Sequence, residues 1–400
     1  MHSPPSMSRR AFRAQWVWCQ TGVMLEGAWV MLCEGRVEQI TLSRPSGALI
    51  QDLGQGLLLP GLINAHTHLE LSWLAAKNPP QGDFLKWLEG LVAYIPGQDQ
   101  EQIVKAAADA AQEMAAQGTA CAGDITNSGL AQESFAQAGL SGVSFFEALG
   151  SQKAEPPPES WAWKGPRLQA TAIAAHAPYS VPSWRLKALK KRSHRLPFCI
   201  HLAESEAEME FFAGKGQQGK RLEEFLSRRG MKRQDLELKA SRPLPHLMAL
   251  GVVDQNTLLI HGVHLSRSEA AMLAGAGASL CICPRSNLGL TGAMAPVAKL
   301  VDAGVNLALG TDSLASAPDL SLWAEMAVLY NRFPGLDPEL ILAMATTGGA
   351  KALGLGRFFG GIFPGAAGPL AFVPLADLPM AEALGALVSG DHAGMPRKVS

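Results

Sequence analysis

Residues 57–68 read LLLPGLINAHTH, an apolar run that ends in His66, Thr67 and His68. The run predicts a short buried strand. Because successive strand side chains point to opposite faces, His66 and His68 would present both imidazoles on one side. A strand end of this kind offers a metal ion two nitrogen ligands. Alone, such a pair is more often packed or solvated than metal-binding, so the rest of the chain decides its interpretation.

Three further apolar runs end in residues of metal-ligating or catalytic type. These residues are His201 and Glu204 after 196–200, His261 after 257–260, and Asp312 after 305–310. Polar residues at the C-terminal ends of several separate strands are typical of the active site of a (β/α)8 barrel. We therefore expect these side chains to meet His66 and His68 at one end of such a barrel.

Five motifs, in chain order, resemble those of the amidohydrolase superfamily, in its branch of cytosine deaminase-like and adenosine-analogue deaminases. They are PGLINAHTH at 60–68, HLAE at 201–204, HGVHL at 261–265, CPRSNL at 283–288 and GTDS at 310–313. Within that branch, the set is most similar to the aminodeoxyfutalosine deaminases of menaquinone biosynthesis. The resemblance implies hydrolytic deamination of an aminated heterocycle, by attack of metal-bound hydroxide and release of ammonia.

Strand and helix signals alternate between the two ends of the chain, as an α/β fold with a parallel barrel requires. We expect a (β/α)8 TIM-like barrel over residues 60–363. Residues 1–59 and 364–400 are expected to form a small β-sandwich domain from both chain ends. The eight barrel strands are expected at the His66 run, 119–124, 142–147, 170–175, the runs before His201 and His261, 278–283 and 305–310.

The resemblance implies that one divalent metal is held by His66, His68, His201 and Asp312. Three neutral nitrogens and one carboxylate oxygen suit Zn²⁺, and Fe²⁺ stays open as an alternative because affinity alone does not choose the metal. Binuclear members of the superfamily have a bridging Lys after strand four. Here that strand leads into AAHAPY at 174–179, so a single metal is expected.

Three residues are expected to carry the proton chemistry. A metal held by these ligands would lower the pKa of a bound water to about 7, and Asp312 would accept the proton of that water. Glu204, three residues after His201, would protonate a ring nitrogen and relay a proton to the departing ammonia. His261 would hydrogen-bond the attacking water or the developing oxyanion.

The residues expected to contact the substrate are Glu70, Trp87, His176, Arg285 and Ser286. Glu70 would hold ribose hydroxyls, and Trp87 would stack on a flat ring or be part of the core. Arg285 would pair with a substrate carboxylate or form a salt bridge to a neighbouring loop. His264, at an odd spacing from His261, is expected to point away from the site.

Composition indicates a small-molecule enzyme. The formal net charge of −1 argues against nucleic acid as a partner, and no apolar run is long enough to span a membrane. Six scattered cysteines favour the reducing cytoplasm over a disulfide framework. A homodimer is left open, as is the function of the polar stretch 215–242, either a lid or a solvated helix.

Two other functions remain open from the sequence. The same ligands would serve guanine deaminase, chlorohydrolase or imidazolonepropionase chemistry, since fold and metal site are shared by many substrates. A non-catalytic amidohydrolase-like scaffold is the alternative from a different class. Such scaffolds typically lose metal ligands, whereas this chain keeps four candidate ligands together with Glu204 and His261.

Overall fold

The computed structural model describes residues 9–151 and 155–400. The sequence also predicts disorder at Met1–Pro5, and these residues lie outside the described ranges. No helix in the described ranges is long and apolar enough to cross a membrane.

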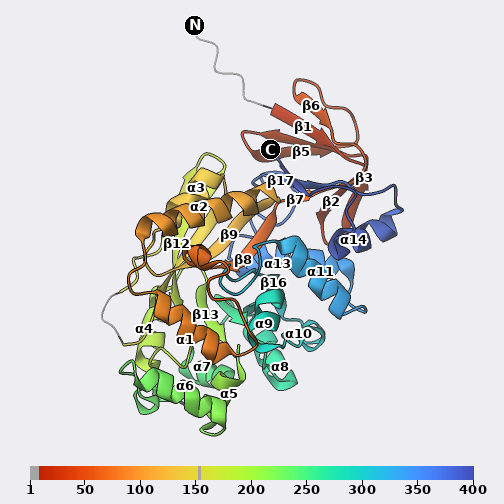
Figure 1. Cartoon of the computed structure of the whole chain (residues 1–400). Helices are drawn as coiled ribbons and strands as arrows, with labels where there is room; N and C mark the ends of the chain where they lie inside the picture. The colour runs from red at the N-terminus through yellow and green to blue at the C-terminus, as the bar shows by residue number, and fades with distance from the viewer. Residues whose placement is uncertain (1–8, 152–154) are drawn as a thin grey trace.

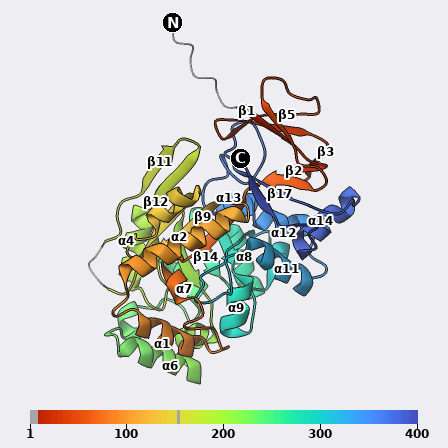
Figure 2. The same cartoon turned by 45° about the horizontal axis from the view of Figure 1, so that its top comes forward.

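Eight parallel strands form the barrel predicted from the sequence (Figure 1). In sheet order they are β8 (Leu62–Thr67), β9 (Thr119–Thr126), β10 (Ser141–Ala148), β12 (Arg167–Ala175), β13 (Phe198–Leu202), β14 (Thr257–His261), β15 (Ser279–Ile282) and β16 (Asn306–Leu309). One further strand, β11 (Ser160–Lys164), pairs antiparallel with β12, and Figure 2 shows this hairpin in yellow-green.

The barrel closes between its last and first strands. Thr67 and Asp312 form a parallel bridge, and the Asp312 amide donates to the His66 carbonyl over 3.1 Å. Gly310 permits this approach, because a Cβ there would lie 2.7 Å from Cys281 Sγ and 2.8 Å from His66 Cβ. The closure brings the ends of β8 and β16 together, and with them the candidate ligands.

Helices follow most barrel strands and cover the sheet. They are η1 (Leu69–Leu74), α1 (Phe84–Tyr94), α2 (Gln100–Ala116), α3 (Gln132–Ala138), α4 (Ser183–Arg192), α5 (Glu206–Ala213), α6 (Gln217–Ser227), η2 (Arg233–Leu236), α7 (Pro243–Leu250), α8 (Arg267–Ala276), α9 (Pro284–Thr291), α10 (Val297–Asp302), α11 (Leu322–Arg332), α12 (Pro338–Met344) and α13 (Thr347–Ala352). Side-chain caps start several of them. Ser266 and Glu269, for example, form a reciprocal capping box at α8.

Two smaller sheets are built from the chain ends. One has the order β5-β4-β1-β6 and the other β18-β17-β7-β2-β3. Their strands are β1 (Arg9–Arg13), β2 (Trp16–Gln20), β3 (Val23–Glu26), β4 (Trp29–Cys33), β5 (Arg36–Thr41), β6 (Leu49–Asp52), β7 (Leu57–Pro60), β17 (Leu370–Val373) and β18 (Arg397–Val399). Buried residues of both sheets, among them Phe12, Val30, Leu58 and Phe372, share one apolar cluster.

The run 57–65 is two strands rather than one. β7 belongs to a terminal sheet and β8 to the barrel, and the chain passes between them at Gly61. A Cβ at Gly61 would lie 2.4 Å from Ala120 Cβ and 2.6 Å from the Pro369 carbonyl oxygen. Only glycine fits at this junction, so the apolar pattern continues while the sheet changes.

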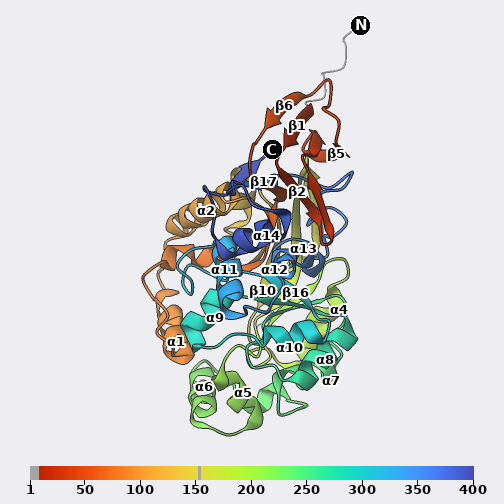
Figure 3. The same cartoon turned by 90° about the vertical axis from the view of Figure 1, so that its right-hand side faces the viewer.

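The last helix of the chain packs against helices of the barrel. α14 (Met380–Ser389) contacts α11 and α12 on the outside of the barrel, as Figure 3 shows. Its buried residues Ala383, Leu387 and Val388 join the largest apolar cluster of the barrel. The division into residues 60–363 and a sandwich of 1–59 and 364–400 stays a prediction.

Candidate active site

The C-terminal ends of four barrel strands bring the predicted site residues together. One group consists of His66, His68 and His201, and a second of Glu204, His261 and Asp312. Within each group the candidate ligand atoms all lie within 4.8 Å of one another. The ring centroid of His66 is 5.1 Å from that of His201 and 5.7 Å from that of His261, so the two groups form one site.

The backbone is strained where the chain leaves these strands. Ala203, His261 and Asp312 have φ values of 50°, 75° and 57°, in the left-handed region that residues other than glycine rarely adopt. Each such residue costs of order 1–3 kcal/mol and persists only where the surrounding structure enforces it. Strain at three adjacent strand ends points to a site in which side-chain direction matters more than local stability.

Burial keeps the site histidines neutral. It lowers the pKa of His66, His68, His201 and His176 to about 4. Removal from water disfavours the charged imidazolium, whereas a neutral ring keeps a lone pair for a metal. These histidines are therefore in the metal-binding form at neutral pH.

The donor set fits a divalent metal. Neither ring nitrogen of His66, which is fully buried, has a hydrogen-bond partner among the described residues. Asp312 Oδ1 lies 3.5 Å from Nε2 of both His66 and His68. His201 Nδ1 is 2.6 Å from the His176 carbonyl oxygen, so Nδ1 carries the proton and Nε2 is left for a ligand bond.

Two serine hydroxyls hold the other oxygen of Asp312. Ser286 Oγ and Ser316 Oγ donate to Asp312 Oδ2 over 2.6 and 2.7 Å. These bonds orient the carboxylate so that Oδ1 faces the histidines, as partners of metal ligands commonly do. Ser286 is fully buried and contacts this carboxylate, and the substrate contact expected of it stays a prediction. Ser316 was missed because nothing in the sequence around it distinguishes it from other loop serines.

Glu204 is a buried acid next to His261. Its Oε1 lies 3.5 Å from His261 Nε2, and the residue is only 8% exposed. Burial, followed by the nearby Asp312 and Glu208 carboxyl groups, raises the pKa of Glu204 well above its usual value. The raised pKa favours the protonated carboxyl group, which is the state a proton donor needs.

Glu147 joins the site although the sequence analysis assigned it no role. It is the last residue but one of β10, where its Oε1 lies 3.6 Å from His201 Nδ1 and has no hydrogen-bond partner among the described residues. Its other oxygen accepts from Asn127 Nδ2 over 3.1 Å. Glu147 and His176 group with His201, which also belongs to the first group, so they do not form an independent metal site. Its position at a strand end was the available sequence signal.

Glu70 lies beside the site, but its carboxylate is already bound. It accepts from the Thr126 hydroxyl, from Ser128 Oγ over 2.8 Å, and from backbone amides of residues 127, 128 and 130 over 2.9–3.2 Å. The side chain thus fixes the loop after β9. The contact with ribose that is expected of Glu70 stays a prediction. Both oxygens of its carboxylate already accept hydrogen bonds from the protein.

Arg285 forms salt bridges within the protein, which was one of the two alternatives expected for it. Its Nε donates to Glu325 Oε1 over 2.8 Å and its Nη2 to Asp319 Oδ1 over 2.7 Å. The side chain of Arg285 is 12% exposed and that of Glu325 fully buried. The guanidinium therefore fastens the start of α9 to α11, which leaves it poorly placed for a substrate carboxylate.

Arg285→Met is expected to lower the free energy of unfolding by about 3–5 kcal/mol, because it strands the buried Glu325 carboxylate. Arg285→Met/Glu325→Leu should recover most of that loss. Denaturant unfolding measures both, with Arg228→Met as the matched control. Arg228 pairs with Glu89 at the surface, where an ion pair is worth about 0–1 kcal/mol. A single variant with unchanged stability and a raised KM would instead assign Arg285 to substrate binding.

The other expected substrate residues lie around the mouth of the barrel. His176 is next to the metal-type histidines, with its ring 5.4 Å from that of His201 and its Nδ1 2.6 Å from Ser180 Oγ. Trp87 on α1 packs near Phe84, and its Nε1 donates to the Ala315 carbonyl over 2.9 Å. Substrate contacts at both residues stay predictions.

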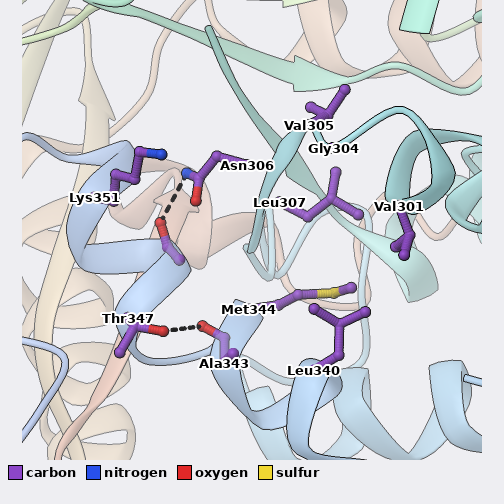
Figure 4. Close-up of a pocket in the computed structure, with 11 residues that line it drawn as sticks. Val301, Gly304, Val305, Asn306, Leu307, Leu340, Ala343, Met344, Thr347 and Lys351 are labelled. Carbon is purple, nitrogen blue, oxygen red and sulfur yellow. Dashed lines mark hydrogen bonds between the residues drawn. The ribbon is translucent and has the colours of Figure 1, made fainter. Parts of the chain in front are cut away.

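Two cavities lie outside the cluster of histidines. One of about 200 Å³ lies between the starts of α1 and α5 and the end of α9, and His264 and Glu206 are among its lining residues. The polar stretch 215–242 forms α6 and η2, and Gln218 of α6 also lines this cavity. The other, of about 390 Å³, lies at the opposite ends of the strands, where Asn306 begins β16 and Lys351 reaches the rim (Figure 4). Active sites of these barrels lie at the C-terminal end, so the second cavity is separate from the site.

Comparisons with known proteins agree with this arrangement. A model described as the amidohydrolase family matches residues 57–399. The chain is 32% identical over 353 residues to a 5-methylthioadenosine/S-adenosylhomocysteine deaminase of Syntrophobacter fumaroxidans, covering 77% of this chain and 70% of that protein. It is 30% identical over 354 residues to the Pyrococcus furiosus deaminase of the same name, covering 82% and 77%.

Solved structures share the fold. An aminofutalosine deaminase of Helicobacter pylori, in complex with methylthio-coformycin, superposes with a TM-score of 0.79 at 23% identity, covering 98% of this chain and all of that one. A zinc-bound adenosine deaminase of Xanthomonas campestris gives a TM-score of 0.77 at 24% identity, covering 96% and 90%.

Proposed function

Since the chain belongs to the amidohydrolase family, we propose that this enzyme is a metal-dependent hydrolytic deaminase of an adenosine-type nucleoside. The observation that carries the proposal is the placement of the buried Glu204 and of His261 beside three histidines and Asp312. The deaminases among the relatives, which act on 5-methylthioadenosine and S-adenosylhomocysteine by name, support the substrate class.

The proposed metal site consists of His66, His68, His201 and Asp312, with Zn²⁺ as the first candidate and Fe²⁺ as the second. A divalent metal in this site would supply the Lewis acidity that makes a water molecule nucleophilic near neutral pH. Asp312 would take the proton that this water loses. The serine bonds to its Oδ2 hold the carboxylate in place for that transfer.

The remaining proton steps fall to Glu204 and His261. Glu204 gives its proton to the ring nitrogen next to the aminated carbon, which makes that carbon more electrophilic as the C–O bond forms. His261 hydrogen-bonds the attacking oxygen. Glu204 then moves a proton from the new hydroxyl to the amino group. The C–N bond breaks, and ammonia and the keto product leave. The proton that Asp312 took from the water then returns to Glu204, whose carboxylate lies in the same cluster, and restores the starting state.

Three nucleosides are the finer candidates within this class. Aminodeoxyfutalosine follows from the motif resemblance, whereas 5-methylthioadenosine and S-adenosylhomocysteine follow from relatives at 30–32% identity. The ion pairs of Arg285 remove one reason to expect a substrate carboxylate at that position.

We expect the zinc-loaded protein to release ammonia from at least one of these three nucleosides. The test is a coupled ammonia assay on a panel that also includes adenosine, guanine and cytosine, with product mass to confirm replacement of –NH₂ by oxygen. Turnover of guanine alone would contradict the proposed substrate class and indicate a guanine deaminase. Silence over the whole panel with zinc bound would contradict the substrate class, and silence without bound zinc would favour a scaffold.

A further inference from the structure

Asn287 is a buried residue of α9 whose side chain contacts His261 of the candidate site. It is 1% exposed, as is His261, and its side-chain Nδ2 lies 3.0 Å from His261 Nδ1. The residue belongs to the CPRSN motif, in which the sequence analysis assigned no role to the asparagine. The backbone of His261 is itself in the left-handed region, a conformation that persists only where the surrounding structure enforces it.

The first turn of α9 is held firmly enough to define this contact. The Arg285 backbone amide donates to Glu325 Oε2 over 2.9 Å, and the Arg285 side chain binds the other oxygen of the same carboxylate. One residue further along, Ser286 binds Asp312. Asn287 therefore projects from a turn that is tied on one side to α11 and on the other to a candidate metal ligand.

A hydrogen bond from the amide settles which imidazole nitrogen carries the proton. An amide nitrogen can only donate, so His261 Nδ1 must accept, and the single proton of the neutral ring then lies on Nε2. His261 Nε2 is the nitrogen that faces Glu204 Oε1 at 3.5 Å. In this tautomer, His261 presents an N–H to the site rather than a lone pair.

From these contacts we infer that Asn287 is a positioning residue that sets the tautomer of His261, so that Nε2–H donates a hydrogen bond in the reaction. This inference rests on the proposed function and extends it. It assigns His261 the part of hydrogen-bond donor and leaves Glu204 and Asp312 as the groups that move protons. The role of Asn287 is to act through His261, without touching the substrate.

Two substitutions separate this role from a structural one. Asn287→Asp keeps the shape but replaces the donor by an acceptor, so Nδ1 takes the proton and Nε2 loses it. Asn287→Ala removes the bond without imposing the wrong tautomer. We expect kcat to fall by about 10²–10³-fold in Asn287→Asp, the usual cost of losing one such donor, with little change in KM, and to fall less in Asn287→Ala. A structural role predicts the reverse order, because Asp is the closer fit.

Asn306→Asp is the matched control. Asn306 Nδ2 donates to Ser279 Oγ over 2.9 Å and to the Gly348 carbonyl over 3.2 Å at the opposite end of the barrel. Its substitution also turns an amide donor into an acid, and kcat should stay close to that of the unmodified protein. Melting temperatures of all three variants show whether a loss of kcat reflects unfolding.

The direct test is the ¹⁵N spectrum of the histidine rings in the zinc-loaded protein, with the His261 signals identified by their loss in His261→Gln. We expect His261 to show an unprotonated Nδ1 and a protonated Nε2, and Asn287→Asp to exchange the two. A protonated Nδ1 in the unmodified protein, or the same tautomer in both proteins, overturns the inference. This readout needs no turnover, so it stands apart from any failure to find a deaminase substrate.

Discussion

Glu204→Gln is expected to lower kcat by about 10²–10⁴-fold while the protein keeps its metal. Proton transfer by a positioned side chain contributes a factor of this size. Glutamine has nearly the shape of glutamate but no transferable proton, so neither protonation of the ring nitrogen nor transfer to the amino group can occur. Ammonia release under saturating substrate, with metal content determined in the same samples, measures the effect.

Burial is the reason for expecting so large a loss. Glu204 is 8% exposed, and burial followed by the nearby Asp312 and Glu208 carboxyl groups raises its pKa well above the usual value, which favours the protonated form. Glu206→Gln is the matched control, because Glu206 is exposed at the start of α5 only two residues away. That variant should keep its kcat. An active Glu204→Gln variant with full metal content would assign the proton transfers to another residue.

The parts of the site that follow from local pattern could be predicted from sequence. His66, His68, His201, His261 and Asp312 each end an apolar run or follow it closely, and strand ends in a parallel barrel meet. The apolar runs, together with the resemblance to the amidohydrolase superfamily, predicted the eight strands. This prediction also gave Glu147 a place at a strand end, but a carboxylate alone does not reveal whether it faces a substrate, a loop or a histidine.

The parts that depend on distant partners could not be predicted. Arg285 is bound by Glu325, 40 residues later in the sequence, and Glu70 is bound by amides around Asn127, 57 residues later. A sequence pattern shows that such a side chain is polar but not which partner takes it. The need for glycine at position 61 also depends on a distant residue. A Cβ at this position would lie too close to the Pro369 carbonyl oxygen.

The second large effect concerns the candidate metal ligands. His66→Asn is expected to abolish stoichiometric zinc binding and, with it, detectable ammonia release. His66 is fully buried, and both of its ring nitrogens lack a hydrogen-bond partner among the described residues. A buried polar group without a partner costs about 1–3 kcal/mol, so a ligand bond is the best reason for histidine at this position.

Thermal unfolding with and without zinc gives a readout that is independent of turnover. A ligand that binds only the folded state stabilises it by about 2.7 kcal/mol at 100 times its Kd, so added zinc should raise the Tm of the metal-free unmodified protein. The Tm of His66→Asn should not respond. His194→Asn, in an exposed residue outside the site, should respond like the unmodified protein. Equal zinc content and an equal rise in Tm for His66→Asn would place the metal elsewhere and remove the basis for the proposed chemistry.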